Sequence, residues 1–298
     1  MVTGIRLDHL RVLAVSGTDR ASFLQGQLTQ DVGALDSRTA VISGGADAKG
    51  RLQFTSYTFS LPVGNDEAIA LVVPAELADD LLKRLRLYVF RAKVQIAILD
   101  CVLLGLLDAS EPGGPVATVR LPGAGNRHLI VDTDSGTPPA AMSDNATDRW
   151  ELAEIQAGVP TIVTATVGQF VPQMVNLDLL GAISFSKGCY TGQEIVARMK
   201  YLGRVKRRML RFSAEGLAPS AGTPLYARRG IVGQIARSAP AVTGCEFLAV
   251  LTVDDLPGPF FLDEALTQPA TLLPLPYEVP EAPSAGTTSG SDDIVGTP

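Results

Sequence analysis

Short apolar runs joined by tight links determine the fold class of the first third of the chain. Runs with strand character cover residues 10–15, 41–43, 52–59 and 68–73. The glycine-rich link at 44–50 predicts a hairpin, a connection that requires antiparallel neighbours. Residues 74–85 have helical spacing and begin with a proline, and residues 88–99 return to strand chemistry. Because helices alternate here with hairpins, we expect an α+β sandwich and not a wound parallel sheet.

The rest of the chain changes character twice. Residues 109–148 are rich in Gly, Pro, Ser, Thr and Asp, which predicts a reduced, loop-rich subdomain. Strand-like runs then recur at 209–212, 230–235 and 247–251, separated by turn residues, which is typical of a small closed or partly closed β-barrel. We therefore divide the chain into an N-terminal α+β domain (1–108), a second subdomain with the signature loop and helix that follow it (109–203), a barrel (204–280) and a disordered tail (281–298).

Charge and composition narrow the possible functions. The net charge of −6 argues against a nucleic-acid binder driven by overall charge. Seven basic residues do gather at 198–211, either as a solvated face or as a rim for an anionic ligand. No signal peptide is expected at the N-terminus and no apolar run reaches membrane-spanning length. Three widely spaced cysteines fit a reducing cytoplasm, where we place the protein.

Familiar motifs are missing from the sequence. Two histidines, at 9 and 128, are too few for a histidine-rich metal site, and no metal is expected. The sequence contains no HExxH, CxxC, P-loop, GxGxxG or GxSxG pattern. Metal, nucleotide and serine-hydrolase functions are therefore disfavoured.

Residues 185–194 hold the densest group of chemically useful side chains. Thr191 and Glu194 have the spacing of a capping box, which predicts that a helix begins at Gly192. Cys189 would lie just before the helix N-terminus, two residues after Lys187. The helix dipole and the ammonium would both favour a thiolate and lower the pKa of an exposed Cys189. An ordinary capped helix with an inert cysteine is the alternative.

A second candidate is the only tryptophan, Trp150. It lies near the start of a predicted helix that opens at residue 148 and ends at Gly158. It could anchor that helix in the core, or it could form an aromatic wall for a flat ring.

The stretch 187–194 closely resembles the signature of the folate-binding YgfZ family. Further segments match that family: 23–32, 47–51, 88–90, 93–94, 169–173, 176–177, 196–198 and 275–277. The resemblance covers nearly all of residues 5–280, with the 109–148 region shortened. The family is related to the T-protein aminomethyltransferases of the glycine cleavage system.

This resemblance implies a fold and a function. The fold would be three domains in a ring around a central folate cavity, with a C-terminal β-barrel. The function would be a tetrahydrofolate-binding accessory protein that supports assembly or repair of iron–sulfur enzymes, including tRNA-modifying ones. The cofactor would be tetrahydrofolate or a one-carbon derivative, and the partners iron–sulfur client proteins, without direct nucleic-acid binding.

The resemblance also assigns site residues. Cys189 would be the reactive group, with Lys187 as its charge partner. The expected folate contacts are the following side chains: Leu10, Trp150, Tyr190, Gln193, Glu194 and Arg198.

Two departures from the T-protein pattern limit what is carried over. T-protein relatives have an aspartate in the strand that corresponds to residues 52–56 here. In this chain the strand contains Phe54 and Thr55 and no carboxylate. Without that group, nothing at this position can deprotonate a folate amine, so a conventional enzyme is not expected. In addition, Leu10 stands where the family has a tryptophan, which removes a stacking partner. A folate-dependent aminomethyl or one-carbon transferase and a non-catalytic interaction scaffold remain the alternatives.

Overall fold

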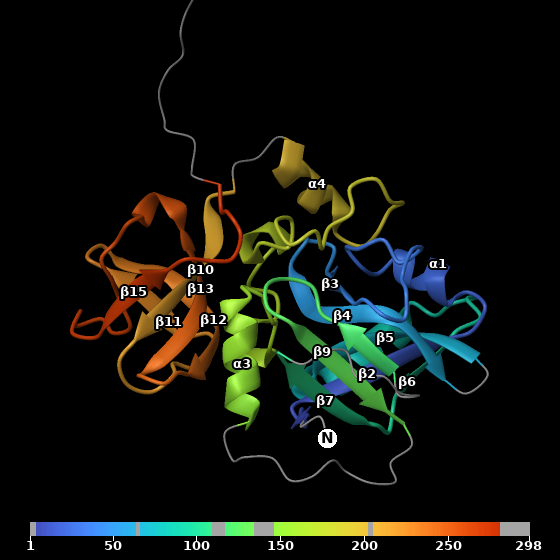
Figure 1. The fold of residues 1–298 in the computed structure, drawn as a ribbon. Helices are drawn as coiled ribbons and strands as arrows, with labels where there is room; N and C mark the ends of the chain where they lie inside the picture. The colour runs from blue at the N-terminus through green and yellow to red at the C-terminus, as the bar shows by residue number, and fades with distance from the viewer. Residues whose placement is uncertain (1–3, 64–65, 109–116, 134–145, 202–204, 281–298) are drawn as a thin grey trace, which may run out of the picture.

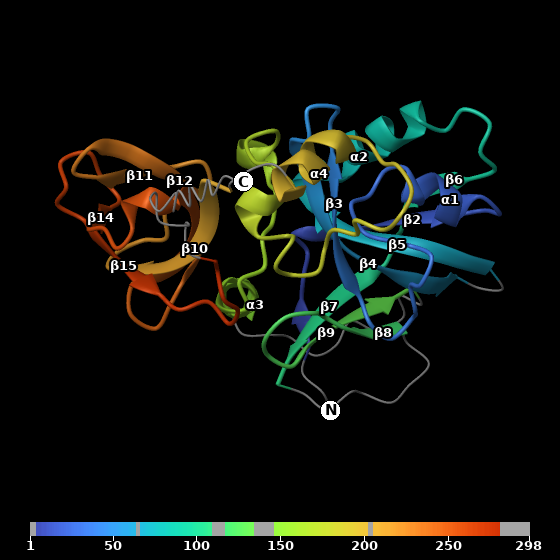
Figure 2. The ribbon, with the colours of Figure 1, turned by 90° about the horizontal axis from the view of Figure 1, so that it is seen from above.

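The computed structural model describes residues 4–63, 66–108, 117–133, 146–201 and 205–280. Their strands form a five-stranded sheet, a four-stranded sheet and a closed six-stranded barrel (Figures 1 and 2). This arrangement confirms the predicted α+β class and the C-terminal barrel. Across the described ranges, no helix combines the length and apolar character needed to span a membrane. The tail predicted to be disordered, 281–298, lies outside the described residues.

The five-stranded sheet is antiparallel and contains the predicted hairpin. Its strands, in spatial order, are β3 (Val41–Ala46), β4 (Leu52–Val63), β5 (Asp66–Pro74), β2 (Leu10–Ser16) and β6 (Gln95–Ile98). Helix α2 (Ala75–Leu87) begins directly after Pro74 and packs against β2 and β6. Its buried side chains recur at helical spacing, as the sequence predicts: Leu77, Ala78, Leu81 and Leu85.

Helix α1 (Arg20–Gln25) is shorter than the sequence predicts, because pairing with β3 competes with the helix. The apolar residues Ala21, Leu24 and Leu28 are spaced as on one helix face, which predicts a helix that continues to about Gln30. Instead, Leu28 forms a β-bridge with Gly45, and the N–H of Thr29 donates to the carbonyl of Gly44 at 2.8 Å. Local helical spacing is overridden here by a tertiary contact. The strand expected over 88–99 is likewise confined to β6.

The four-stranded sheet joins the start of the chain to its middle. Its strands, in order, are β1 (Ile5–Arg6), β7 (Val102–Leu107), β9 (Arg127–Asp132) and β8 (Ala117–Arg120). Helix α3 (Ala146–Gln156) lies between this sheet and the barrel (Figure 1). The Trp150 ring lies directly over Gly105 of β7, where a Cβ atom would come within 2.4 Å of the indole. Glycine is therefore required for this close approach of helix and sheet.

The barrel closes around a cluster of aromatic rings. Its strands are, in order around the barrel, β10 (Arg207–Ala214), β13 (Cys245–Thr252), β12 (Gly230–Pro240), β11 (Pro224–Ala227), β14 (Phe260–Phe261) and β15 (Pro269–Leu273). The ring of Phe212 stacks on Phe247 and meets Phe260 edge-on, each at 5.4 Å between ring centroids. Cys245 is buried in the same core.

A long connection with little regular structure links α3 to the barrel. It contains two short 3₁₀ helices, η1 (Thr164–Thr166) and η2 (Pro172–Val175), and then helix α4 (Gln193–Tyr201); a third, η3 (Val253–Asp255), follows β13. The connection contacts both the five-stranded sheet and the barrel. The N–H of Leu52 in β4 donates to the carbonyl of Phe170, and Arg208 of β10 forms an ion pair with Asp178 at 2.6 Å. These contacts fix the connection between the five-stranded sheet and the barrel.

Candidate functional site

A cavity lies where the five-stranded sheet, α3 and strand β12 of the barrel meet. It has an inner compartment of about 30 Å³ and an outer one of about 390 Å³. Four residues line both compartments: Leu10, Pro74, Thr161 and Arg237. The inner compartment has room for about one or two water molecules, whereas the outer one falls within the size range of small-molecule sites.

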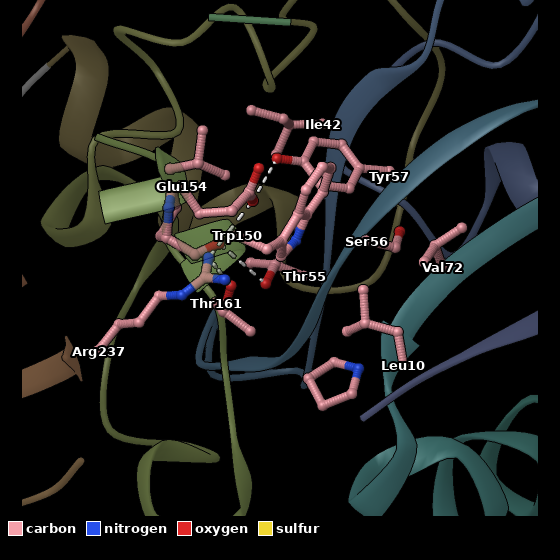
Figure 3. A pocket seen from close by; sticks show the side chains of 13 residues that line it. Leu10, Ile42, Thr55, Ser56, Tyr57, Val72, Trp150, Glu154, Thr161 and Arg237 are labelled. Atoms are coloured by element: carbon pink, nitrogen blue, oxygen red, sulfur yellow. Dashed lines mark hydrogen bonds and ion pairs between the residues drawn. The ribbon is translucent and has the colours of Figure 1, made fainter. Parts of the chain in front are cut away.

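Two of the predicted folate contacts, Leu10 and Trp150, meet at the inner compartment. Leu10 comes from the start of β2, and Trp150 comes from α3 (Figure 3). Trp150 is only 1% exposed, and it does not line the outer compartment. In this structure the indole is therefore a helix anchor that closes the inner end of the cavity.

A buried cluster of charged groups surrounds Glu154 of α3, and sequence reasoning missed it. The carboxylate accepts hydrogen bonds from the Tyr57 hydroxyl at 2.6 Å and from Arg237 at 3.4 Å, and it pairs with Arg127. Figure 3 shows Glu154, Tyr57 and Arg237 converging beside the indole of Trp150. Burial and the neighbouring Glu154 raise the pKa of Tyr57, so its hydroxyl stays protonated and donates.

Glu151, three residues before Glu154, forms the outer part of the same cluster. Its carboxylate accepts from Arg237 Nε at 2.8 Å and lies 2.9 Å from His9 Nε2. Burial alone would raise the pKa of Glu151, but Arg237 and His9 outweigh it and lower the pKa to about 2. Glu151 therefore stays ionised.

The sequence holds part of the signal for this cluster. Trp150 and Glu154 are four residues apart on one predicted helix, so the same face carries both. Strand 52–56 brings no carboxylate to the cavity, as its sequence shows, but α3 supplies Glu151 and Glu154. In the strand itself, Thr55 Oγ1 donates to the Pro160 carbonyl and accepts from the N–H of Ile162.

The signature loop lies elsewhere, and Lys187 fastens it to the first domain. Lys187 is buried, with 9% of the residue exposed, and its ammonium donates to the carbonyls of Leu28 at 2.7 Å and Gln30 at 2.8 Å. It also lies 5.1 Å from the centre of the Tyr190 ring. Burial lowers the pKa of Lys187 to about 8, although the Asp31 carboxylate acts against this. These contacts describe an anchor for the loop.

The loop continues into α4 one residue later than expected. The helix begins at Gln193 and not at Gly192, and the N–H of Thr191 donates to the carbonyl of Gly26 at 3.2 Å. The Gln193 side chain accepts from the N–H of Tyr190. Burial raises the pKa of Tyr190 to about 12.

The predicted site residues thus fall into two groups. Cys189, Glu194 and Arg198 are exposed. The six predicted site residues of the loop and α4 line neither compartment of the cavity: Lys187, Cys189, Tyr190, Gln193, Glu194 and Arg198. Of the predicted site residues, only Leu10 and Trp150 lie at the cavity. The cavity and the signature loop are therefore separate sites.

Comparison with known proteins decides the family. No family model matches the chain. Three curated relatives, all called tRNA-modifying protein YgfZ, are similar over most of their length. The protein from Serratia proteamaculans is 31% identical over 94% of both chains, that from Klebsiella pneumoniae 34% over 77% of both, and that from Edwardsiella ictaluri 33% over 93% of this chain and 92% of its own.

The chain belongs to the YgfZ family. The resemblance read from the signature stretch is confirmed. Among solved structures, the glycine cleavage system aminomethyltransferase T from Bartonella henselae is similar with a TM-score of 0.65 and 14% identity, over 91% of this chain and 84% of that chain. At this identity the likeness shows the fold alone. It supports the predicted T-protein-like architecture of this YgfZ family member.

We expect Glu151→Gln to change how stability depends on pH. The folded pKa of about 2 lies below that of a free glutamate, about 4.3, so the ionised form stabilises the fold at neutral pH and this contribution is lost as the pH falls through that interval. The variant should lose on the order of 1–3 kcal/mol of unfolding free energy near pH 7. Its stability should also fall less than that of the wild type between about pH 4.3 and 2.

Denaturant titrations across the pH range measure both effects of Glu151→Gln. Glu264→Gln, at an exposed position of the barrel, serves as the control. Parallel pH profiles for Glu151→Gln and the wild type would contradict the assignment.

Lys187→Met tests the anchor. It keeps much of the aliphatic length but leaves two carbonyls without their donor. The amides of Ser184 and Thr191 bond to Thr29 and Gly26, and they should exchange with deuterium at least about tenfold faster in the variant. Lys83→Met, at an exposed lysine of α2, serves as the matched control and should leave both rates unchanged. Unaltered protection in Lys187→Met would show that the ammonium does not hold the loop.

The three thiols should differ in reactivity. Cys189 is exposed, whereas Cys101 is half-buried and Cys245 is buried. Burial raises the pKa of the Cys101 and Cys245 thiols. Brief treatment with iodoacetamide, read by mass spectrometry of peptides, should label Cys189 at least about tenfold faster than either. Equal labelling of Cys101 would count against Cys189 as the reactive group.

Proposed function

We propose that this chain is a tetrahydrofolate-binding accessory protein that supports the assembly or repair of iron–sulfur enzymes, including tRNA-modifying ones. Its curated relatives are named tRNA-modifying proteins, and a solved structure with the same fold is named an aminomethyltransferase. The observation that carries the proposal is the 390 Å³ outer compartment of the cavity, where the five-stranded sheet, α3 and the barrel meet. We place the protein in the cytoplasm, which the three free cysteines support.

The outer compartment fits a folate head group in size and lining. Its walls combine apolar surfaces from Leu10, Pro74 and Val163 with the hydroxyls of Thr161 and Ser238. These residues would hold the ligand, and bound tetrahydrofolate would supply a carrier for a one-carbon unit. Trp150 and the other inner residues would support the wall from behind. The inner compartment, at about 30 Å³, does not fit a bicyclic ring.

Binding is favoured over one-carbon transfer by the state of the two carboxylates that α3 brings to the cavity. A general base works best with a pKa near the working pH. The Glu151 carboxylate has a pKa of about 2, and Glu154 is already held by three donors. Neither is suited to take a proton from a folate amine. For this reason we do not propose aminomethyl transfer.

Cys189 would act on partner proteins and not on the cavity ligand. Its thiol is exposed on the signature loop, which Lys187 holds in place, and it lines neither compartment. One cysteine does not provide the four protein ligands that iron–sulfur clusters usually have, so an iron–sulfur client would have to share any bridged group. The exposed position lets such a client approach without entering the cavity.

Calorimetric titration with tetrahydrofolate tests the binding step. Ala221→Phe places a ring in the outer compartment and should weaken binding at least about tenfold. Ala241→Phe, at a half-buried turn outside both compartments, should bind like the wild type. If the wild type does not bind tetrahydrofolate, the interaction scaffold becomes the better description.

A complementation test addresses the thiol. Cys189→Ser should bind tetrahydrofolate normally and yet fail to restore the activity of an iron–sulfur tRNA-modifying enzyme in a deletion strain. Cys101→Ser should restore it. Full restoration by Cys189→Ser would remove the thiol from the proposal.

A further inference from the structure

The ionisable groups that line the cavity are predominantly acidic. Among the described residues that line its two compartments, three are glutamates: Glu76, Glu151 and Glu154. The only permanent cation is Arg237, with His9 as the one titratable imidazole. A ligand in the outer compartment therefore meets two carboxylates, Glu76 and Glu151, and one guanidinium, while Glu154 is buried at the inner compartment.

The guanidinium of Arg237 is already committed to the protein's own acids. It donates to Glu151 at 2.8 Å, to Glu154 at 3.4 Å and to the Thr161 hydroxyl at 2.7 Å. Burial disfavours its charge, but the carboxylates outweigh burial and raise its pKa. Arg127, which pairs with Glu154 from behind, adds a second cation to the cluster. Two guanidinium groups and two carboxylates are thus matched, and little positive potential remains for a ligand.

Glu76 gives the outer compartment its remaining charge. It lies in the first turn of α2. One oxygen accepts the N–H of Thr164 at 2.8 Å, which is a neutral partner. The side chain therefore adds a negative charge at the wall of the outer compartment that no lining cation offsets.

We propose that the outer compartment selects an uncharged or cationic ring that is rich in hydrogen-bond donors and disfavours anionic extensions of its ligand. Carboxylates accept from the ring and exocyclic N–H groups of a reduced pterin, whereas each glutamate of a folate tail brings a further negative charge toward Glu76 and Glu151. The inference rests on the proposed function and specifies its ligand: affinity comes from the pterin head, and it falls as the glutamyl tail lengthens.

Three ligands of increasing charge test this selection: 6-methyltetrahydropterin without a tail, tetrahydrofolate, and its pentaglutamate. In calorimetry at low salt, the tail-free pterin should bind within about threefold of tetrahydrofolate, and the pentaglutamate should bind about threefold or more weakly than tetrahydrofolate. The penalty should shrink at high salt, because added ions screen the exposed Glu76.

Glu76→Gln isolates the charge. Glutamine keeps an oxygen that can accept the N–H of Thr164, so the local structure is preserved. The variant should bind the pentaglutamate about threefold more tightly than the wild type does, and it should bind 6-methyltetrahydropterin no more tightly than the wild type does. Glu264→Gln makes the same change in net charge at an exposed barrel position outside both compartments, and it should alter neither affinity.

Three other results of these titrations would contradict the inference, and each identifies the step that fails. If the pentaglutamate binds as tightly as tetrahydrofolate or more tightly, the charge selection is wrong while folate binding stands. If only ligands with a tail bind, the head group is not the source of affinity. If none of the three binds, the proposed function fails together with the inference.

Discussion

The arrangement of this molecule depends on one buried carboxylate, that of Glu154. This carboxylate accepts a hydrogen bond from Tyr57 of the five-stranded sheet. It also pairs with Arg127 of the four-stranded sheet and with Arg237 of the barrel. One side chain on α3 therefore bonds to all three sheets. Breaking a buried pair by removing one partner typically costs about 3–5 kcal/mol, because the other charge is left uncompensated. The relative placement of the sheets and the integrity of the cluster are thus coupled.

The same helix gives the cavity its shape and its charge. Trp150 packs into the space left by Gly105 and closes the inner end, while Glu151 and Glu154 bind the guanidinium of Arg237 at the border with the outer compartment. What holds the sheets together therefore also removes positive potential from the cavity. Structural stability and the lack of free positive charge in the cavity have a common origin in one turn of α3.

Sequence reasoning succeeded where local pattern decides the outcome. The β3–β4 hairpin, helix α2 after Pro74 and the barrel strands all follow from residue spacing and turn chemistry. The helical spacing before Gln30 was overridden because residues 28 and 29 pair with β3. The family followed from a specific signature stretch, which the curated relatives confirm.

The composition of the cluster and the loop anchor could not be predicted, for a physical reason. Arg127 and Arg237 meet Glu154 only because two sheets and a barrel stack around α3, and spacing along the chain says nothing about stacking. Lys187 is close to Cys189 in sequence, which suggested an electrostatic partnership. Spacing along the chain did not indicate that its ammonium bonds to carbonyls almost 160 residues away. Side-chain chemistry marks candidate residues, but only tertiary packing defines their partners.

The anchor of the signature loop has a consequence for sequence variation. Lys187 binds main-chain oxygens at positions 28 and 30, and every residue type offers such an oxygen. The hydrogen bonds of the anchor therefore place no requirement on the side chains at these two positions, although Leu28 is buried in the core for packing. An insertion between α1 and Leu28 would disturb the anchor more, because it would displace both carbonyls at once. The signature loop thus constrains the path of a distant stretch of backbone through contacts that the side chains of that stretch do not make.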